Sequence, residues 1–133
     1  MSGPVEIDPA LVDRFRENLT RVSRLGQDDR LGVAVSGGPD SVALLLLAHA
    51  ALPGRVEAAT VDHGLRPEAA GEARFVADLC ATLGVPHAIL AVTVEEDGDG
   101  IQAAARAARY AALGRWAGAR GLAAIATALV LAP

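Results

Sequence analysis

The chain contains no lysine, a single cysteine and very few aromatic residues, and each shortage excludes a class of structure or chemistry. All 12 basic residues are arginine, which excludes Schiff-base chemistry and the phosphate-binding lysine of GxxxxGK(S/T) loops. The lone Cys80 excludes an internal disulfide. Aromatic residues make up only 3% of the chain, against 52% for hydrophobic residues as a whole. This composition favours a helix-rich α/β domain over a β-sandwich.

Long apolar segments and targeting signals are also missing. The longest apolar run, residues 42–52, contains His49 and is far shorter than the roughly 20 residues that a membrane-spanning helix needs. No basic start followed by an apolar core is present at the amino terminus, so no secretory signal is expected. We therefore expect a cytoplasmic protein without a membrane anchor, and 133 residues are enough for one domain.

Metal-ligating residues are scattered, and the charge is unevenly distributed. The three histidines lie too far apart in the sequence to indicate a zinc site, and Cys80 is interpreted as a buried, inert thiol within a helix. The net charge of −4 argues mildly against nucleic-acid binding by the chain as a whole, because phosphate neutralisation supplies most of that affinity. Four arginines and no acidic residue follow Asp99, however, so the carboxyl-terminal third is locally basic.

Alternating helical and strand patterns predict the element order α-β-α-β-α-β-α-β. Helices are expected at residues 9–25, 41–52, 72–83 and 101–119, and strands at 31–35, 56–61, 87–94 and 122–132. Asp8 is expected to cap the first helix and Gly84 to end the third. The acidic segment at residues 95–100 is interpreted as a mobile surface loop, because it lacks the full ligand spacing of an EF-hand. The expected fold is α/β, with a mostly parallel, Rossmann-like sheet of about four strands and helices on both faces.

Ligands of parallel sheets bind at the carboxyl ends of the strands, and the loop SGGPDS follows the first expected strand. Gly37 and Gly38 permit close backbone approach, and the amide groups that enter the next helix point at a bound anion. Asp40 is unusual here, because a carboxylate repels phosphates unless a divalent cation lies between them. A magnesium-bridged nucleotide resolves this conflict; alternatively, Asp40 only complements the helix dipole.

The hexapeptide SGGPDS resembles the SGGxDS signature of the PP-loop ATP pyrophosphatases, whose members bind ATP through its pyrophosphate. Two further segments, VDHGLRPEAAGEARFVADLCATLGVPH and GIQAAARAARYAALGRWAGARGLAAIATA, closely resemble the tRNA(Ile)-lysidine synthases of that superfamily. The resemblance covers residues 11–128 and implies the adenine nucleotide α-hydrolase type of fold. In that family ATP adenylates the C2 oxygen of the wobble cytidine of an isoleucine tRNA. Free lysine then displaces AMP to form lysidine.

The resemblance also implies roles for individual residues. It assigns ATP binding to Ser36, Gly37, Gly38, Asp40, Ser41, Asp62 and His63. It assigns magnesium to Asp40, and catalysis to Asp40, Arg106 and Arg109, of which the two arginines match the family's AARxxRY helix. A guanidinium there can neutralise charge on the α-phosphate as pyrophosphate leaves. The alternatives are a loop-stabilising hydrogen bond for His63 and a solvated surface position for either arginine.

The end of the chain departs from the family pattern. Members continue after the fourth strand with a TAHHxxDQxET-like segment; here Thr127 and Ala128 match it, whereas residues 129–133 do not. Residues 1–133 are therefore expected to be an amino-terminal PP-loop domain, incomplete at its carboxyl end and without the tRNA-binding domains that follow in the family. The resemblance implies isoleucine tRNA and free lysine as substrates, and it leaves open a homodimer of the full-length protein. The alternatives are a nucleotide-binding remnant without turnover and a PP-loop tRNA thiolase, which generally needs reactive cysteines or an iron-sulfur cluster.

Overall fold

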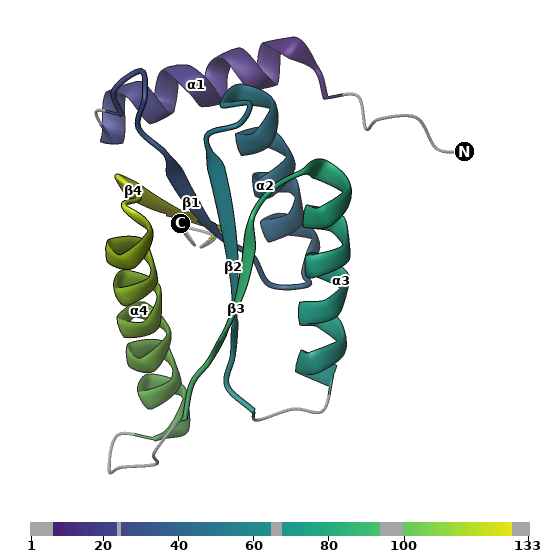
Figure 1. Ribbon diagram of the computed structural model, residues 1–133, viewed down its shortest axis with the longest axis vertical. Helices are drawn as coiled ribbons and strands as arrows, with labels where there is room; N and C mark the ends of the chain where they lie inside the picture. Colours follow the sequence, from purple (N-terminus) through teal and green to yellow (C-terminus); the bar gives the residue numbers. More distant parts are fainter. Residues whose placement is uncertain (1–6, 24, 65–67, 94–99, 129–133) are drawn as a thin grey trace.

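The computed structural model describes residues 7–23, 25–64, 68–93 and 100–128 (Figure 1). Helices and strands alternate in this part of the chain: α1 (Pro9–Ser23), β1 (Leu31–Ala34), α2 (Pro39–Ala51), β2 (Val56–Asp62), α3 (Glu68–Leu83), β3 (His87–Ala91), α4 (Ile101–Arg120) and β4 (Ala124–Thr127). The predicted element order is confirmed, although α3 begins one turn earlier than expected. Most of the acidic segment interpreted as a surface loop, and the divergent residues 129–133, lie outside the described residues.

The described strands form one parallel sheet in the order β3-β2-β1-β4. Leu31, at the start of β1, is in register with Val56 of β2 and Ala124 of β4, so β1 is central. Helices α2 and α3 cover one face of the sheet, α4 covers the other, and α1 lies against α2 (Figure 1). The predicted α/β fold with helices on both faces is confirmed. From β1 the chain runs to β2 and β3 on one side, and α4 then returns it to β4 on the other side of β1. This reversal places a topological switch point at the carboxyl end of β1.

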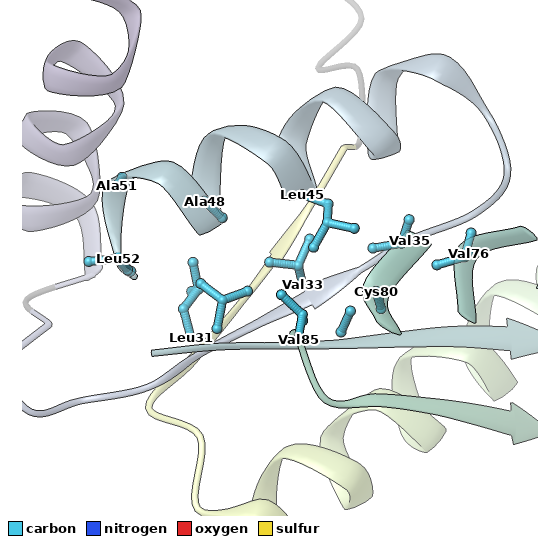
Figure 2. Packing of buried hydrophobic residues seen from close by; sticks show 12 residues of the cluster. Leu31, Val33, Val35, Leu45, Ala48, Ala51, Leu52, Val76, Cys80 and Val85 are labelled. Atoms are coloured by element: carbon cyan, nitrogen blue, oxygen red, sulfur yellow. The ribbon is translucent and has the colours of Figure 1, made fainter. Parts of the chain in front are cut away.

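Two apolar clusters attach the helices to the sheet. On the α2 and α3 face, Leu31 and Val33 of β1 pack with Leu45, Val76 and Cys80 (Figure 2). On the α4 face, the cluster is formed by Ala34, Ala59, Leu113 and Trp116. Burial of the Cys80 side chain raises the pKa of its thiol to about 11, so the interpretation of an inert thiol is confirmed.

Close contact between α4 and the sheet depends on Gly32 in β1. A Cβ atom at this position would lie 2.8 Å from both the Trp116 ring and the Leu122 side chain. Real Cβ contacts are essentially never that short, so any larger residue would push α4 away from the strand. The glycine therefore sets the distance of α4 from the centre of the sheet.

A buried carboxylate joins the carboxyl end of α4 to the edge of the sheet where β1 and β2 begin. Glu57, the second residue of β2, is only 2% exposed. Its Oε1 accepts a hydrogen bond from Arg120 Nε at 2.7 Å and its Oε2 accepts one from Arg120 Nη2 at 3.1 Å. Arg30, which directly precedes β1, also pairs with this carboxylate. The three charges fix the carboxyl end of α4 at the amino ends of β1 and β2.

Local signals at the helix ends behave as predicted, and two apolar residues of the helices are exposed. The Ala10 amide donates to Asp8 Oδ1 at 2.9 Å, as expected for the cap of α1, and Gly84 has a φ of 74°, as expected after a helix end. Phe75 and Val22 match the helical spacing of packed residues, yet their side chains are 54% and 82% exposed. None of the described helices combines the length and apolar character that crossing a membrane would require.

Candidate functional site

A cavity of about 550 Å³ lies at the carboxyl ends of the strands, beside the switch point. Its walls come from the loop after β1, the end of β2, the first turns of α3, the inner side of α4 and the residue that follows β4. The lining residues are Ala34, Val35, Ser36, Ser41, Ala59, Thr60, Val61, His63, Ala69, Glu72, Gln102, Arg109 and Ala128. The cavity thus joins segments that are far apart in the sequence, as expected for a ligand site of an α/β sheet.

Hydrogen bonds to the hydroxyl of Ser41 close the loop between β1 and α2. Ser41 Oγ accepts a hydrogen bond from the Ser36 amide at 3.0 Å and lies 3.0 Å from the Ser36 carbonyl oxygen and 2.9 Å from Ser36 Oγ. The Gly38 amide in turn donates to Ser36 Oγ at 3.2 Å. Ser41 is 6% exposed, so its hydroxyl holds the loop in shape, a role that the sequence did not predict.

The two glycines of the loop have different steric surroundings. A Cβ on Gly37 would lie 2.9 Å from Glu72 Cβ and 3.0 Å from Glu72 Cγ, which is too close for a real contact. A Cβ on Gly38 would meet only Ser36 Oγ, at 3.4 Å. Gly38 also has ordinary extended backbone angles, with φ −75° and ψ 158°. The loop therefore requires a glycine at residue 37 in order to rest against α3, whereas residue 38 has room for a methyl group.

Asp40 lies in the first turn of α2, with an exposed side chain, and does not line the cavity. Pro39 occupies the first helical position, where a missing N–H costs nothing. No group of three or more His, Cys, Asp or Glu side chains that could hold a metal occurs within the described part of the chain. Any cation beside Asp40 would therefore need further ligands from a bound molecule or from water.

The end of β2 supplies a turn and an unpartnered histidine nitrogen. Asp62 Oδ1 accepts a hydrogen bond from the Gly64 amide at 2.9 Å, and Gly64 has a φ of 68°. His63 lines the cavity, and its Nδ1 is buried without a hydrogen-bond partner among the described residues. Asp62 therefore closes the turn at Gly64, while the loop-stabilising role considered for His63 stays an alternative. A buried ring nitrogen without a partner indicates a position where a ligand can supply one.

Two neighbouring charges act on His63. Burial and then the positive charge of Arg109 lower the pKa of the imidazole, while Asp62 acts in the opposite direction. The ring is therefore neutral near pH 7, with one nitrogen as donor and the other as acceptor. A neutral imidazole beside a guanidinium suits recognition of a polar ligand group better than it suits ion pairing.

Arg106, Arg109 and Tyr110 lie together on α4, as the sequence predicted. The guanidinium carbon of Arg106 lies 5.6 Å from the centre of the Tyr110 ring, and that of Arg109 lies 5.9 Å from it. Arg109 is half-buried and lines the cavity, whereas Arg106 is exposed and lies outside the lining. Gln102 lines the cavity from the same helix; its spacing of seven residues from Arg109 could have revealed it.

Replacing Arg109 with alanine is expected to raise the pKa of His63, because the substitution removes a positive charge that disfavours protonation of the ring. The change would be measured from the pH dependence of the histidine ring signals in NMR spectra. Arg115→Ala is the matched control, since Arg115 is exposed on the same helix and does not line the cavity. A pKa of His63 that stays constant in Arg109→Ala would contradict the electrostatic contact.

The same shift gives a direction for acid stability. His63 and His87 both have a pKa lowered by burial, so the unfolded chain binds protons more readily than the folded protein. Stability from these two groups is therefore fully present above about pH 6.5, the ordinary histidine value, and is lost as the pH falls below it.

Comparison of the sequence with models of known protein families identifies the family of this domain. Residues 11–131 match the PP-loop domain. The chain belongs to the PP-loop family. Membership of this family implies that the domain uses ATP, and the resemblance read from SGGPDS is confirmed. The roles that the resemblance gives to individual residues stay predictions.

Relatives of this PP-loop domain include two bacterial tRNA(Ile)-lysidine synthases. The synthase of Zymomonas mobilis is 52% identical over 114 residues, which are 86% of this chain and 34% of that protein. The synthase of Methylobacterium nodulans is 50% identical over 121 residues, which are 90% of this chain and 35% of that protein. The chain thus spans about a third of the length of the curated relatives that it matches. The second resemblance read from the sequence, to the lysidine synthases, is also confirmed.

Solved structures with the same fold are more distant in sequence. The NH3-dependent NAD synthetase from Campylobacter jejuni matches with a TM-score of 0.51 at 20% identity, over 64% of this chain and 37% of that one. The U34-tRNA thiolase from Methanococcus maripaludis matches with a TM-score of 0.50 at 14% identity, over 67% of this chain and 32% of that one. At these identities the likeness shows a shared fold.

Proposed function

We propose that this PP-loop domain binds ATP and adenylates the wobble cytidine of an isoleucine tRNA, as part of a ligase that forms lysidine. The observation that carries the proposal is the cavity at the switch point, which is lined both by Ser36 and Ser41 of the glycine loop and by His63 and Arg109. The relatives named tRNA(Ile)-lysidine synthase support it, because about half of their aligned residues are identical to this chain.

The loop suits the pyrophosphate of ATP. The first amide groups of α2 are free of intrahelical partners, and the helix dipole places partial positive charge there, so the start of α2 attracts an anion. Gly37 and Gly38 leave the backbone accessible, and the Ser36 side chain is exposed beside them. Ser41 acts indirectly, because its buried hydroxyl sets the shape of the loop.

Across the cavity, Arg109 and His63 suit the α-phosphate and the cytidine. In the proposed first step the cytidine C2 oxygen attacks the α-phosphorus and pyrophosphate leaves, while the guanidinium of Arg109 neutralises the charge that develops. In the second step the lysine amine forms a bond to C2 and AMP leaves. His63, neutral and with an unpartnered Nδ1, would hydrogen-bond a polar group of the nucleotide or the base. Arg106 would attract the phosphates that lie outside the cavity.

Magnesium fits the donor set that the loop offers. Protein sites for this ion use one or two carboxylates and take their other ligands from substrate phosphates and water, so the exposed carboxylate of Asp40 is sufficient. When bound, magnesium would neutralise negative charge on the pyrophosphate. Asp40 would hold the ion at the start of α2, which removes the conflict between a carboxylate and phosphates.

A thiolase function is disfavoured by the state of the sole cysteine. Cys80 of α3 is fully buried in the cluster that this helix forms with β1, β2 and α2, and burial raises the pKa of its thiol to about 11. A thiolate is therefore scarce near neutral pH, and the sulfur has no access to the cavity.

A domain exchange tests the proposal. Residues 11–128 of this chain would replace the matching segment of the Zymomonas mobilis synthase, and lysidine in isoleucine tRNA would be measured by mass spectrometry of nucleosides. We expect lysidine to form in the presence of ATP, magnesium and lysine. Binding of ATP without lysidine or lysine-dependent AMP release would reject ligase activity and favour a nucleotide-binding remnant.

The Asp40→Asn variant tests the magnesium role of Asp40 separately from the exchange. It keeps the size of the side chain but removes the negative charge, so we expect magnesium-dependent ATP binding to be lost in calorimetry with the 133-residue chain. An unchanged ATP affinity would reject the role proposed for Asp40. The homodimer, the cytoplasmic location and the boundaries of this domain within a longer protein stay predictions.

A further inference from the structure

Tyr110 presents a partly exposed aromatic ring to solvent, with two guanidinium groups nearby. It is the only tyrosine of the chain, and its side chain is 38% exposed. Arg106 precedes it by one helical turn and Arg109 is its neighbour, with guanidinium carbons 5.6 Å and 5.9 Å from the ring centre. Both distances fall within the range of cation–π attraction. The arginines therefore restrain the ring in place while part of its surface stays accessible.

The ring lies beside a residue that lines the cavity. Arg109 contacts Tyr110 and also lines the cavity, and Gln102 lines it from the same helix. Tyr110 itself is outside the lining. A group that lies on the ring would therefore be adjacent to a group inside the cavity, but separate from it.

The charge around the ring is positive. Within residues 100–128 there are four arginines and no acidic residue. Arg120 pairs with the buried carboxylate of Glu57. The remaining arginines of α4 are Arg106, Arg109 and Arg115. The chain as a whole has a net charge of −4, and four acidic residues at 95–99 precede α4. The helix itself carries only positive charges, which are complementary to an anionic partner.

An aromatic ring combined with arginines is suited to single-stranded RNA more than to other anions. Unpaired bases stack on aromatic side chains, and the neighbouring phosphates attract guanidinium groups. A phosphorylated peptide would use the arginines but leave the ring without a function. An anionic membrane needs an exposed apolar helix face beside the charges, but Leu113 and Trp116 of α4 are buried against the sheet.

We propose that Tyr110, together with Arg106, is a stacking platform for an unpaired base of the RNA substrate, next to the nucleotide that enters the cavity. This inference rests on the proposed function, since it assumes that the cavity takes a nucleotide of an RNA. Tyr110 is then a positioning residue: by holding the neighbouring base, it keeps the loop of the RNA unstacked and orients the reacting base. Stacking depends on the flat surface of the ring and on the neighbouring arginines, so it does not require the phenolic hydroxyl.

The sole tyrosine allows a direct test on the 133-residue chain. A ring-labelled tyrosine gives one set of NMR signals, which would be followed during titration with a short single-stranded oligocytidylate. We expect an upfield shift of these signals, because a stacked base shields the ring protons. Tyr110→Ala is expected to weaken RNA binding about five- to 150-fold, the range for loss of one stacked base, whereas Tyr110→Phe retains it. Arg115→Ala, the control on the same helix, is expected to weaken binding less than Tyr110→Ala does.

The outcomes separate this inference from the proposed function. ATP affinity is measured on the same samples, and Tyr110→Phe, which keeps the ring beside Arg109, is expected to leave it unchanged. Tyrosine signals that do not move while RNA binds would overturn the platform, as would equal RNA affinities of Tyr110→Ala and the unmodified chain. Loss of stability in Tyr110→Ala would be detected by its melting temperature, and Tyr110→Phe with intact folding and lost binding would also overturn the inference. Absent ATP binding with normal stacking would instead contradict the proposed function alone.

Discussion

Gly37→Ala is expected to weaken ATP binding about five- to 150-fold, because the added methyl group has no room beside α3. Its carbon would lie 2.9 Å from Glu72 Cβ and 3.0 Å from Glu72 Cγ. Neither atom is the free end of a side chain, so the loop or the helix must shift. Returning the shifted loop to its ATP-binding shape then costs the overpacking energy, typically about 1–3 kcal/mol, and each 1.4 kcal/mol corresponds to about tenfold in affinity. Calorimetry with ATP and magnesium measures the change.

Gly38→Ala is the matched control for this loop. Its new methyl group would meet only Ser36 Oγ, at 3.4 Å, and its backbone angles suit alanine. We therefore expect its free energy of unfolding to be close to that of the unmodified chain, and its loss of ATP affinity to be smaller than that of Gly37→Ala. Equal effects of the two substitutions would show that contact with Glu72 is not what requires glycine at residue 37.

Glu57→Ala is expected to lower the free energy of unfolding by about 2–4 kcal/mol. Loss of one partner of a buried ion pair typically costs 3–5 kcal/mol, and we reduce that range because the side chains of Arg30 and Arg120 are 37% and 51% exposed and can regain water. The substitution also leaves a void at a position that is 2% exposed. Urea denaturation followed by circular dichroism measures the loss.

Asp13→Ala provides the comparison with a surface ion pair. Asp13 pairs with Arg16 at 3.0 Å within α1, but the two side chains are 68% and 47% exposed. Such pairs contribute about 0.3–0.5 kcal/mol, so the variant should be nearly as stable as the unmodified chain. Similar losses in Asp13→Ala and Glu57→Ala would contradict the importance of burial at Glu57. Glu57→Gln, which keeps the volume, separates the lost charge from the void.

Features set by neighbouring residues could be predicted from the sequence. Asp8 caps α1, Gly84 ends α3 and the glycine loop follows a buried strand, because each depends on a few adjacent residues. The position of the cavity was predictable too, since the carboxyl ends of parallel strands meet at one edge of a sheet.

Contacts between distant segments could not be predicted in this way. The carboxylate of Glu57 meets a guanidinium 63 positions away, and no local pattern indicates which of 12 arginines pairs with it. Gly37 needs its small size because of Glu72, which lies on a different element. Phe75 shows a related limit: helical spacing identifies an apolar stripe, but the sheet accepts only part of it, and here Val76 and Cys80 fill that part.

The central position of β1 has a consequence for how the chain folds during synthesis. β1 pairs with β2 close by in the sequence, but its other neighbour is β4, which begins only at Ala124. When only residues 1–100 have emerged from the ribosome, β1 therefore lies at the edge of the sheet and lacks its second neighbour. Contacts of such wide sequence separation form late and slowly. One edge of β1 therefore stays without a hydrogen-bonded partner until β4 has emerged.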